Sequence, residues 1–246
     1  MNSTLLHCLF EFRSSKFSTS GIFRKYGIDY CCHGNTDLSS ACEKAGADLN
    51  TVINELRDAN KEDIVSGSNN EIPFAEWPLD LLIDYVLKIH HRGIRKNGPV
   101  LLDLIAKVRN AHQASHPELN ELYSLVEESL YDLEMHLQKE ENVLFPYLNS
   151  LFEAAENNRL LEPMHCGTIA NPIRVMNMEH ENEGNRYFHI KELTHNFAVP
   201  EDACNTYKVM LFELEKFITA LFEHIHIENN ILFPMFIELE KKTVRF

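Results

Sequence analysis

The chain has few of the residues that interrupt helices or cross-link small folds. It holds only 9 glycines and 9 prolines in 246 residues, and the alternating Val, Ile and Thr pattern of strands is hard to find. Apolar residues recur instead at spacings of three and four, which favours helices. Six cysteines in a chain of this length do not make a disulfide framework. We therefore expect an all-α protein with reduced thiols, and a cytoplasmic setting.

Positive charge is scarce as well. There are 23 Lys and Arg against 37 Asp and Glu, which gives a formal net charge of −14. A phosphate-backbone partner needs a basic face, so no nucleic-acid partner is expected. No window holds the roughly 20 apolar residues of a membrane span, and Met1–Phe12 lack the features of a signal peptide. We expect no membrane partner either.

The first quarter of the chain predicts a small helical domain. Three short helical patterns lie near Thr19–Tyr26, from the capping pair Thr36–Asp37 to about Gly46, and from Asp48 to about Ala59. Lys61–Pro73 has the composition of a linker. We therefore expect a small helical domain over residues 1–65 and a second domain over residues 74–246.

The second domain predicts a four-helix bundle. Its four long helical segments are about Leu79–Asn110, Pro117–Glu156, Pro172–His195 and Glu201–Lys241. Gly98–Pro99 is expected to kink the first of them. Short joins follow the first and third segments, so each pair should form an antiparallel hairpin.

An internal repeat lies in the second and fourth segments. His136–Pro146 and His224–Pro234 are identical at six of eleven positions. Both copies place a His four residues before a Glu, so the two side chains share one helix face. One such pair is more often solvated or part of a core. Di-iron carboxylate sites, however, take an imidazole and a carboxylate from one helix in this way.

Each copy also has an upstream histidine at nearly the same distance. His91 precedes His136 by 45 residues, and His180 precedes His224 by 44. Residues equidistant from the turn of an antiparallel hairpin lie level, so the members of each pair should face each other. Two copies with level-matched partners are not expected by chance. The predicted ligands of a two-metal site are His91, His136, Glu140, His180, His224 and Glu228.

These ligands predict the kind of metal. Both glutamates can bridge the metals and each metal receives about two histidines, which leaves open positions for an oxo bridge or a small ligand. Nitrogen and carboxylate ligands suit iron best among redox metals, with manganese or zinc as alternatives.

The other histidines are weaker candidates for metal ligands. His90 adjoins His91 but should point about 100° away. His112 is 21 residues beyond His91, roughly 30 Å along a helix, so we interpret it and His116 as surface or capping residues. Glu179, Glu181 and Glu183 flank His180 and can orient an imidazole, although a solvated face is the simpler role for at least two of them.

Cys31 and Cys32 are adjacent in the small domain. Adjacent cysteines form a strained ring when oxidised, so a stable structural disulfide is not expected. The pair is either redox-active, a transient metal site, an acceptor of nitric oxide, or two ordinary core thiols. The four isolated cysteines, which are interpreted as structural, are Cys8, Cys42, Cys166 and Cys204.

The segment Phe23–Cys32, followed by Gly34, resembles the N-terminal domain of the RIC family (repair of iron centres; YtfE, ScdA and DnrN type). The segments that resemble its hemerythrin-like domain are His136–Pro146, Met178–Gly184 and His224–Pro234. The resemblance covers nearly the whole chain.

The resemblance implies a function. It implies two non-haem irons, oxo- and carboxylate-bridged, held by the six ligands above, and a further functional pair in Cys31 and Cys32. It also implies repair of iron–sulfur clusters damaged by nitrosative or oxidative stress, through iron donation to the damaged proteins. Two positions stand out: His33 occupies a place where glycine is common, and His112 matches a histidine often found in the family.

Two alternatives stay open, and with them the question of whether the protein is an enzyme. The di-iron site could reduce nitric oxide, with Cys31 and Cys32 supplying electrons. It could instead bind O₂ or NO reversibly, but the position four residues after His180, where hemerythrin has a further histidine, is Gly184. The oligomeric state is not fixed by the sequence, and a homodimer through the small domain is compatible with it.

Overall fold

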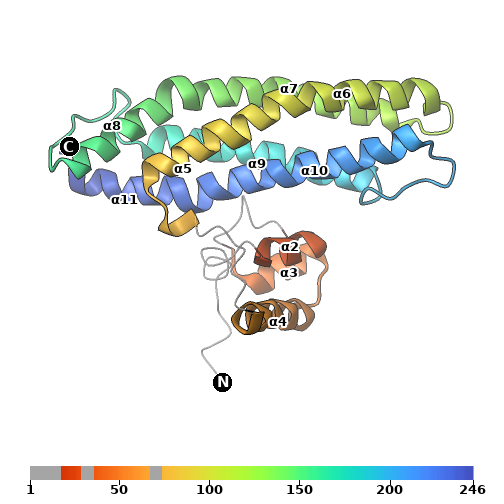
Figure 1. The fold of residues 1–246 in the computed structure, drawn as a ribbon, viewed down its shortest axis with the longest axis horizontal. Coiled ribbons are helices and arrows are strands. Elements are labelled where there is room, and N and C mark those ends of the chain that lie inside the picture. The colour runs from red at the N-terminus through yellow and green to blue at the C-terminus, as the bar shows by residue number, and fades with distance from the viewer. Residues whose placement is uncertain (1–17, 29–35, 67–73, 246) are drawn as a thin grey trace. The chain divides into compact units, whose positions relative to one another are not determined.

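The structure is a computed structural model that describes residues 18–28, 36–66 and 74–245. These residues form helices and no strand, so the described chain is all-α (Figure 1). It divides into two compact units. One comprises the described residues up to Pro78 with Ile225–Met235, and the other comprises Leu79–His224 with the described residues from Phe236 onward. Among the described helices, none is long and apolar enough to cross a membrane.

The small helical region contains α2 (Ser18–Lys25), α3 (Leu38–Ala45) and α4 (Leu49–Ser66). Asp37 caps α3 by accepting a hydrogen bond from the Ser40 amide at 2.9 Å, and Gly46 ends it in the left-handed conformation that glycine adopts easily. Both α2 and α3 pack on α4. The buried apolar residues are Phe23, Ile28, Leu38, Ala41, Cys42, Val52 and Leu56.

The third helix of this region is longer than the sequence predicted. We expected it to end near Ala59 and a linker to start at Lys61, but α4 continues to Ser66. Lys, Glu and Asp at positions 61–63 are compatible with a helix, and the first strong helix breaker is Gly67. The polar composition was therefore a poor guide to where the helix stops.

The four long helical runs of the bundle are each described by their parts. The first contains α5 (Leu79–Tyr85), η2 (Val86–His91) and α6 (Arg92–His112). The second contains α7 (Glu118–Lys139), η3 (Glu140–Leu144) and α8 (Phe145–Glu156). The third is α9 (Ala170–Leu193). The fourth contains α10 (Asn205–Ile227), η4 (Glu228–Leu232) and α11 (Phe233–Thr243).

Contacts between loops fix the direction of these runs. The two hairpin turns meet at one end, where His116 Nε2 lies 2.9 Å from Asp202 Oδ1. At the other end the Thr168 hydroxyl donates to Glu240 at 2.5 Å, just before α9 begins. The runs therefore alternate in direction, which is the up-down topology of a four-helix bundle (Figure 1).

Three of the four runs are not regular α-helices throughout. The segments η2, η3 and η4 are single turns of π-helix, which place one extra residue in the turn. Phe145–Pro146 and Phe233–Pro234 then begin α8 and α11, where the missing proline amide is tolerated in a first turn. Pro99, where we predicted a kink, lies inside α6, which continues past it.

Candidate metal centre

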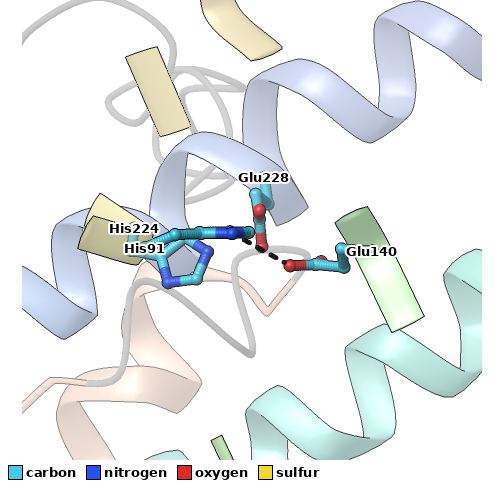
Figure 2. Close-up of side chains that lie close together, drawn as sticks. All are labelled: His91, Glu140, His224 and Glu228. Atoms are coloured by element: carbon cyan, nitrogen blue, oxygen red, sulfur yellow. Dashed lines mark ion pairs between the residues drawn. The ribbon is translucent and has the colours of Figure 1, made fainter. Parts of the chain in front are cut away.

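The structure brings all six predicted ligand side chains together. Two overlapping groups of donor atoms form, and within each group the atoms lie within 4.8 Å of one another. One group contains His91, Glu140, His224 and Glu228, and the other contains His136, Glu140, His180 and Glu228. All six residues are buried. Figure 2 shows the first group, with the polar ends of its side chains pointing toward one another.

The two glutamates, Glu140 and Glu228, belong to both groups. Glu140 lies between two imidazoles: its Oε2 is 3.4 Å from His91 Nε2 and its Oε1 is 3.3 Å from His136 Nε2. Glu140 and Glu228 are the first residues of the π-turns η3 and η4. The two halves of the repeat therefore present their carboxylates from matching turns.

The histidines are grouped differently from the sequence expectation. We expected His91 to face His136 and His180 to face His224 within each hairpin, but each donor group takes one histidine from each hairpin. His136 Nε2 lies 3.0 Å from His180 Nε2. Equal distance from the hairpin turn correctly predicted the height of each histidine along the bundle, but it did not show which neighbouring helix each histidine faces.

His91 is oriented by a carboxylate outside the cluster. Its Nδ1 lies 2.8 Å from Glu141 Oε1, and Arg95 donates to the same oxygen at 2.6 Å. Burial alone would raise the pKa of Glu141, but the hydrogen bonds from Arg95 and His91 outweigh it and lower that pKa. With Nδ1 engaged in this way, the Nε2 lone pair of His91 is directed into the cluster.

His136 has an outer carboxylate of the same kind. Its Nδ1 lies 2.8 Å from Glu179 Oε2, and Lys139 pairs with the other oxygen. The hydrogen bond from His136 is the main reason that the pKa of Glu179 is lowered to about 2. Sequence reasoning placed Glu179 beside His180, its neighbour in the chain. The imidazole that it contacts belongs instead to His136 on the facing helix.

Glu183 belongs to a separate buried network. It accepts a hydrogen bond from the Ser129 hydroxyl at 2.7 Å and pairs with Arg186. The Ser129 hydroxyl also contacts the Tyr187 hydroxyl at 2.7 Å. Burial raises the pKa of Glu183 and opposes its ionised form. This network braces α7 against α9 one turn away from His180.

Two further buried histidines surround the cluster without joining either donor group. The His90 ring stacks on that of His224, with centroids 5.6 Å apart and planes 17° apart. His226 Nδ1 lies 2.8 Å from the Asn230 side-chain amide. Consecutive histidines at 90 and 91 are both buried, but only His91 belongs to a donor group, as the 100° rotation between helix neighbours predicted.

The donor set fits a bound cation. Burying two carboxylates is costly unless positive charge compensates them, and Glu140 and Glu228 are both fully buried. Imidazole and carboxylate ligands in this ratio suit iron, manganese or zinc. Cysteine contributes nothing to either group. The six side chains therefore have the chemistry of a metal centre.

The remaining sequence predictions fall elsewhere. Cys31, Cys32 and His33 lie outside the described residues. His112 and His116 lie at the hairpin end of the bundle, in neither donor group. The sequence carried no signal for the outer partners Glu141 and Arg95, beyond charge on an exposed face.

Comparisons with known proteins agree with this geometry. Residues 82–236 match the profile of the hemerythrin HHE cation binding domain, and residues 11–60 match ScdA_N, a domain of unknown function (DUF542). The chain belongs to the hemerythrin-like iron–sulfur cluster repair protein family. The RIC resemblance read from the sequence is thereby confirmed, as is the all-α hemerythrin-like fold.

Three relatives illustrate the match. The iron–sulfur cluster repair protein YtfE of Pectobacterium carotovorum is 35% identical over 217 residues, which cover 87% of this chain and 88% of that protein. YtfE of Musicola paradisiaca is 32% identical over 87% of this chain and 89% of its own length. A probable iron–sulfur cluster repair protein of Haemophilus influenzae is 33% identical over 87% of this chain and 88% of its own length.

Proposed function

We propose that this protein repairs iron–sulfur clusters damaged by nitrosative or oxidative stress, and that it does so by donating iron from a di-iron site. The ligands would be His91, His136, Glu140, His180, His224 and Glu228. Its partners would be iron–sulfur proteins with damaged clusters. The observation that carries the proposal is the pair of overlapping donor groups that share two buried glutamates, in a chain whose relatives are named for cluster repair.

The ligand count supports a two-metal arrangement. Each group contains two imidazoles and two carboxylates, which leaves each metal short of six ligands. A pair of irons held in this way supplies redox chemistry and exchangeable coordination positions. The protein's own residues hold the site in place: Glu141 and Glu179 fix the orientation of His91 and His136.

A cavity beside the cluster supports release of a cation. It has a volume of about 240 Å³, and its lining includes His136 and His180. Three acidic residues, Asp132, Glu179 and Glu183, also line it. Carboxylates along such a path favour a cation over an anion. Donation would thus proceed from the His136 and His180 side of the site.

The site is tested first by metal content and absorption spectrum. The purified protein should hold about two irons per chain, and the Glu140→Ala/Glu228→Ala double variant should hold almost none. Glu192→Gln, which removes an exposed charge from α9, serves as the matched control. Iron that is unaffected by the double change would overturn the proposed site.

The repair activity needs a separate assay. The iron-loaded protein is mixed with an iron–sulfur protein whose cluster has been damaged by nitric oxide, and recovery of that protein's activity is followed with and without a chelator. Recovery that depends on the loaded site, and that fails with the double variant, supports donation. Full recovery with the double variant would contradict it.

Nitric oxide reduction is the alternative. It predicts turnover of nitric oxide by the protein and a reductant alone, without any damaged client, and repair without net loss of iron from the protein. Reversible O₂ carriage is less favoured, because Gly184, one turn after His180, offers no side-chain ligand.

The proposal includes the domain organisation and the cellular setting. We propose a small domain over residues 1–65, whose Cys31 and Cys32 take part in redox, iron or nitric oxide transfer, followed by a bundle over residues 74–246. Reduced thiols and iron donation to intracellular clusters favour a cytoplasmic setting. Substitution of both cysteines by serine should leave the iron content unchanged and lower the rate of repair.

A further inference from the structure

A second chemically distinctive pair lies at the hairpin end of the bundle. Cys204 is the residue before α10 (Asn205–Ile227), and its side chain is exposed. His112, the last residue of α6, brings its Nε2 to 3.2 Å from the Cys204 sulfur. No spacing or motif links the two residues in the sequence, since 92 residues separate them. Along α6 and η2, His112 is roughly 30 Å from His91.

The surroundings favour the ionised form of the thiol. The backbone amides of Tyr207 and Thr206, in the first turn of α10, and the imidazole of His112 together lower the pKa of Cys204 to about 7. Thiolates are stabilised at helix N-termini and beside histidine in general. Both effects act here on one exposed sulfur.

The neighbouring ring contacts hold His112 in place. Its ring packs edge-on against that of Tyr207, with centroids 5.4 Å apart, and lies 6.2 Å from that of His116. Asp202 and Glu118, which lie at the same end, pair with His116 rather than with the sulfur. A base positioned by its packing beside a sulfur is the arrangement that activates a cysteine nucleophile.

The pair is not a metal site. Three or more ligand atoms that could hold one ion occur only in the His and Glu cluster, among the residues that the structure describes. An exposed thiol with one imidazole partner is instead suited to act as a nucleophile. The exposed Cys166, near the opposite end of the bundle, provides a comparison within the same chain.

We propose that Cys204 and His112 form a reactive thiol site that takes part in exchange with low-molecular-weight disulfides of the glutathione type. This site is separate from the metal centre and its function does not depend on iron. It would add a covalent modification at the hairpin end of the bundle when the ratio of disulfide to thiol rises.

The exchange is balanced in atoms and electrons. The Cys204 proton passes to His112 Nε2, and the thiolate sulfur attacks one sulfur of the disulfide. A new S–S bond forms as the old one breaks, and the second thiol leaves as a thiolate that takes the proton from the imidazolium. The small disulfide is the oxidant, and one of its two sulfurs is reduced.

The pH profile of alkylation tests the site. The full-length, iron-loaded protein is reduced and then labelled briefly with iodoacetamide from pH 5.5 to 9.5, and each cysteine peptide is quantified by mass spectrometry. The labelling of Cys204 should reach half its maximum near pH 7, which is the value to which its pKa is lowered. Cys166, which is also exposed, is quantified in the same samples as the comparison within the chain. Coincident midpoints for the two cysteines would overturn the proposal.

The His112→Asn variant tests the role of the imidazole. It removes the base and keeps a polar side chain, so the midpoint of Cys204 should move upward and that of Cys166 should stay unchanged. Iron content and helical circular dichroism report whether the variant is folded. If a folded variant keeps the midpoint near pH 7, His112 has no part in activation and the proposed pair is wrong.

The exchange itself is measured with oxidised glutathione at pH 7. Lowering a thiol pKa from about 8.5 to 7 raises its thiolate fraction about 16-fold but lowers its intrinsic nucleophilicity about fivefold. Cys204 should therefore react about threefold faster than a thiol of ordinary pKa, and Cys166 is followed in the same samples as the comparison. The mixed disulfide should be found on the Cys204 peptide and be reversed by dithiothreitol. A reaction at Cys204 that is no faster than the reaction at Cys166 would contradict the proposal. An unchanged rate at Cys204 in the His112→Asn variant would contradict it as well.

Discussion

Two groups of histidines lie in the same bundle and differ in almost every physical property. The first group lines the cluster, where His91 and His224 are fully buried and two glutamates face them. The second lies at the hairpin end, where the imidazoles of His112 and His116 contact a thiol and surface carboxylates. Histidine spacing alone does not distinguish them.

What differs is the direction in which each ring is held. In the buried group, Glu141 contacts Nδ1 of His91 and Glu179 contacts Nδ1 of His136, so the Nε2 atom of each of these two rings is directed inward. At the hairpin end His116 has a carboxylate at each ring nitrogen, Glu118 at 2.9 Å and Asp202 at 2.9 Å. A ring with both nitrogens so paired is held as a cation, whereas a ring with one nitrogen directed at shared carboxylates is suited to a metal.

The largest effect is expected from changing either shared glutamate alone. Because Glu140 and Glu228 each belong to both donor groups, Glu140→Ala or Glu228→Ala should lower iron content to less than half of the wild-type value. Metal analysis of both variants after purification under the same conditions checks this. Loss of only one metal position in either variant would show that the carboxylates do not bridge.

A smaller effect is expected from the outer partner of His136. Glu179→Gln keeps the size of the side chain and removes its charge, so the imidazole loses a strong acceptor. The loss of such outer partners typically costs a factor of about 10 to 100 in metal affinity. Competition with a chelator measures the affinity, and Glu192→Gln on the same helix is the control. An unchanged affinity would mean that packing alone orients His136.

The corresponding change beside His91 should cost less. Glu141→Gln removes the charge that faces Nδ1, but the His91 ring is also held between Phe145 and His224, at centroid distances of 5.8 and 5.2 Å. His136 instead lines a cavity. We therefore expect the loss of metal affinity to lie nearer the lower limit of the 10- to 100-fold range, at about tenfold, in the same competition assay. A larger loss than in Glu179→Gln would reverse this ranking.

Sequence reasoning succeeded where periodicity governs structure. Helix spacing and hairpin symmetry predicted the four long runs and selected His91 over His90. They failed at features that no periodicity encodes. The π-turns that begin at Glu140 and Glu228 cannot be read from apolar spacing, since a single extra residue alters it too little.

The pair of Cys204 and His112 at the hairpin end could not be predicted from the sequence for a different reason. Cys204 was interpreted as an isolated structural thiol, and α10 was expected to start at Glu201 rather than at Asn205. Locating Cys204 just before the helix, and His112 beside it, requires the register between two helices of different hairpins. That register is set by side-chain packing across the bundle, such as the contact between His90 on the first run and His224 on the fourth, and not by local pattern.

The smallest effect concerns pH and His116, which is partly buried. Hydrogen bonds to Asp202 and then to Glu118 raise the pKa of His116. A raised pKa in the folded state adds stability that is complete below the unfolded value of about 6.5 and is lost as pH rises through the folded value. His116→Gln should therefore lower the unfolding temperature more at pH 6 than at pH 9.

The size of this difference is limited by solvent. Asp202 is exposed and Glu118 is about one-third exposed, so the pairing should contribute less than about 1 kcal/mol, which corresponds to about 4 °C or less for a domain of this size. Comparing wild type and variant at each pH cancels the loss of metal that both share. An equal difference at pH 6 and pH 9 would show that His116 acts through packing, and the contrast between the two histidine groups would then rest on burial alone.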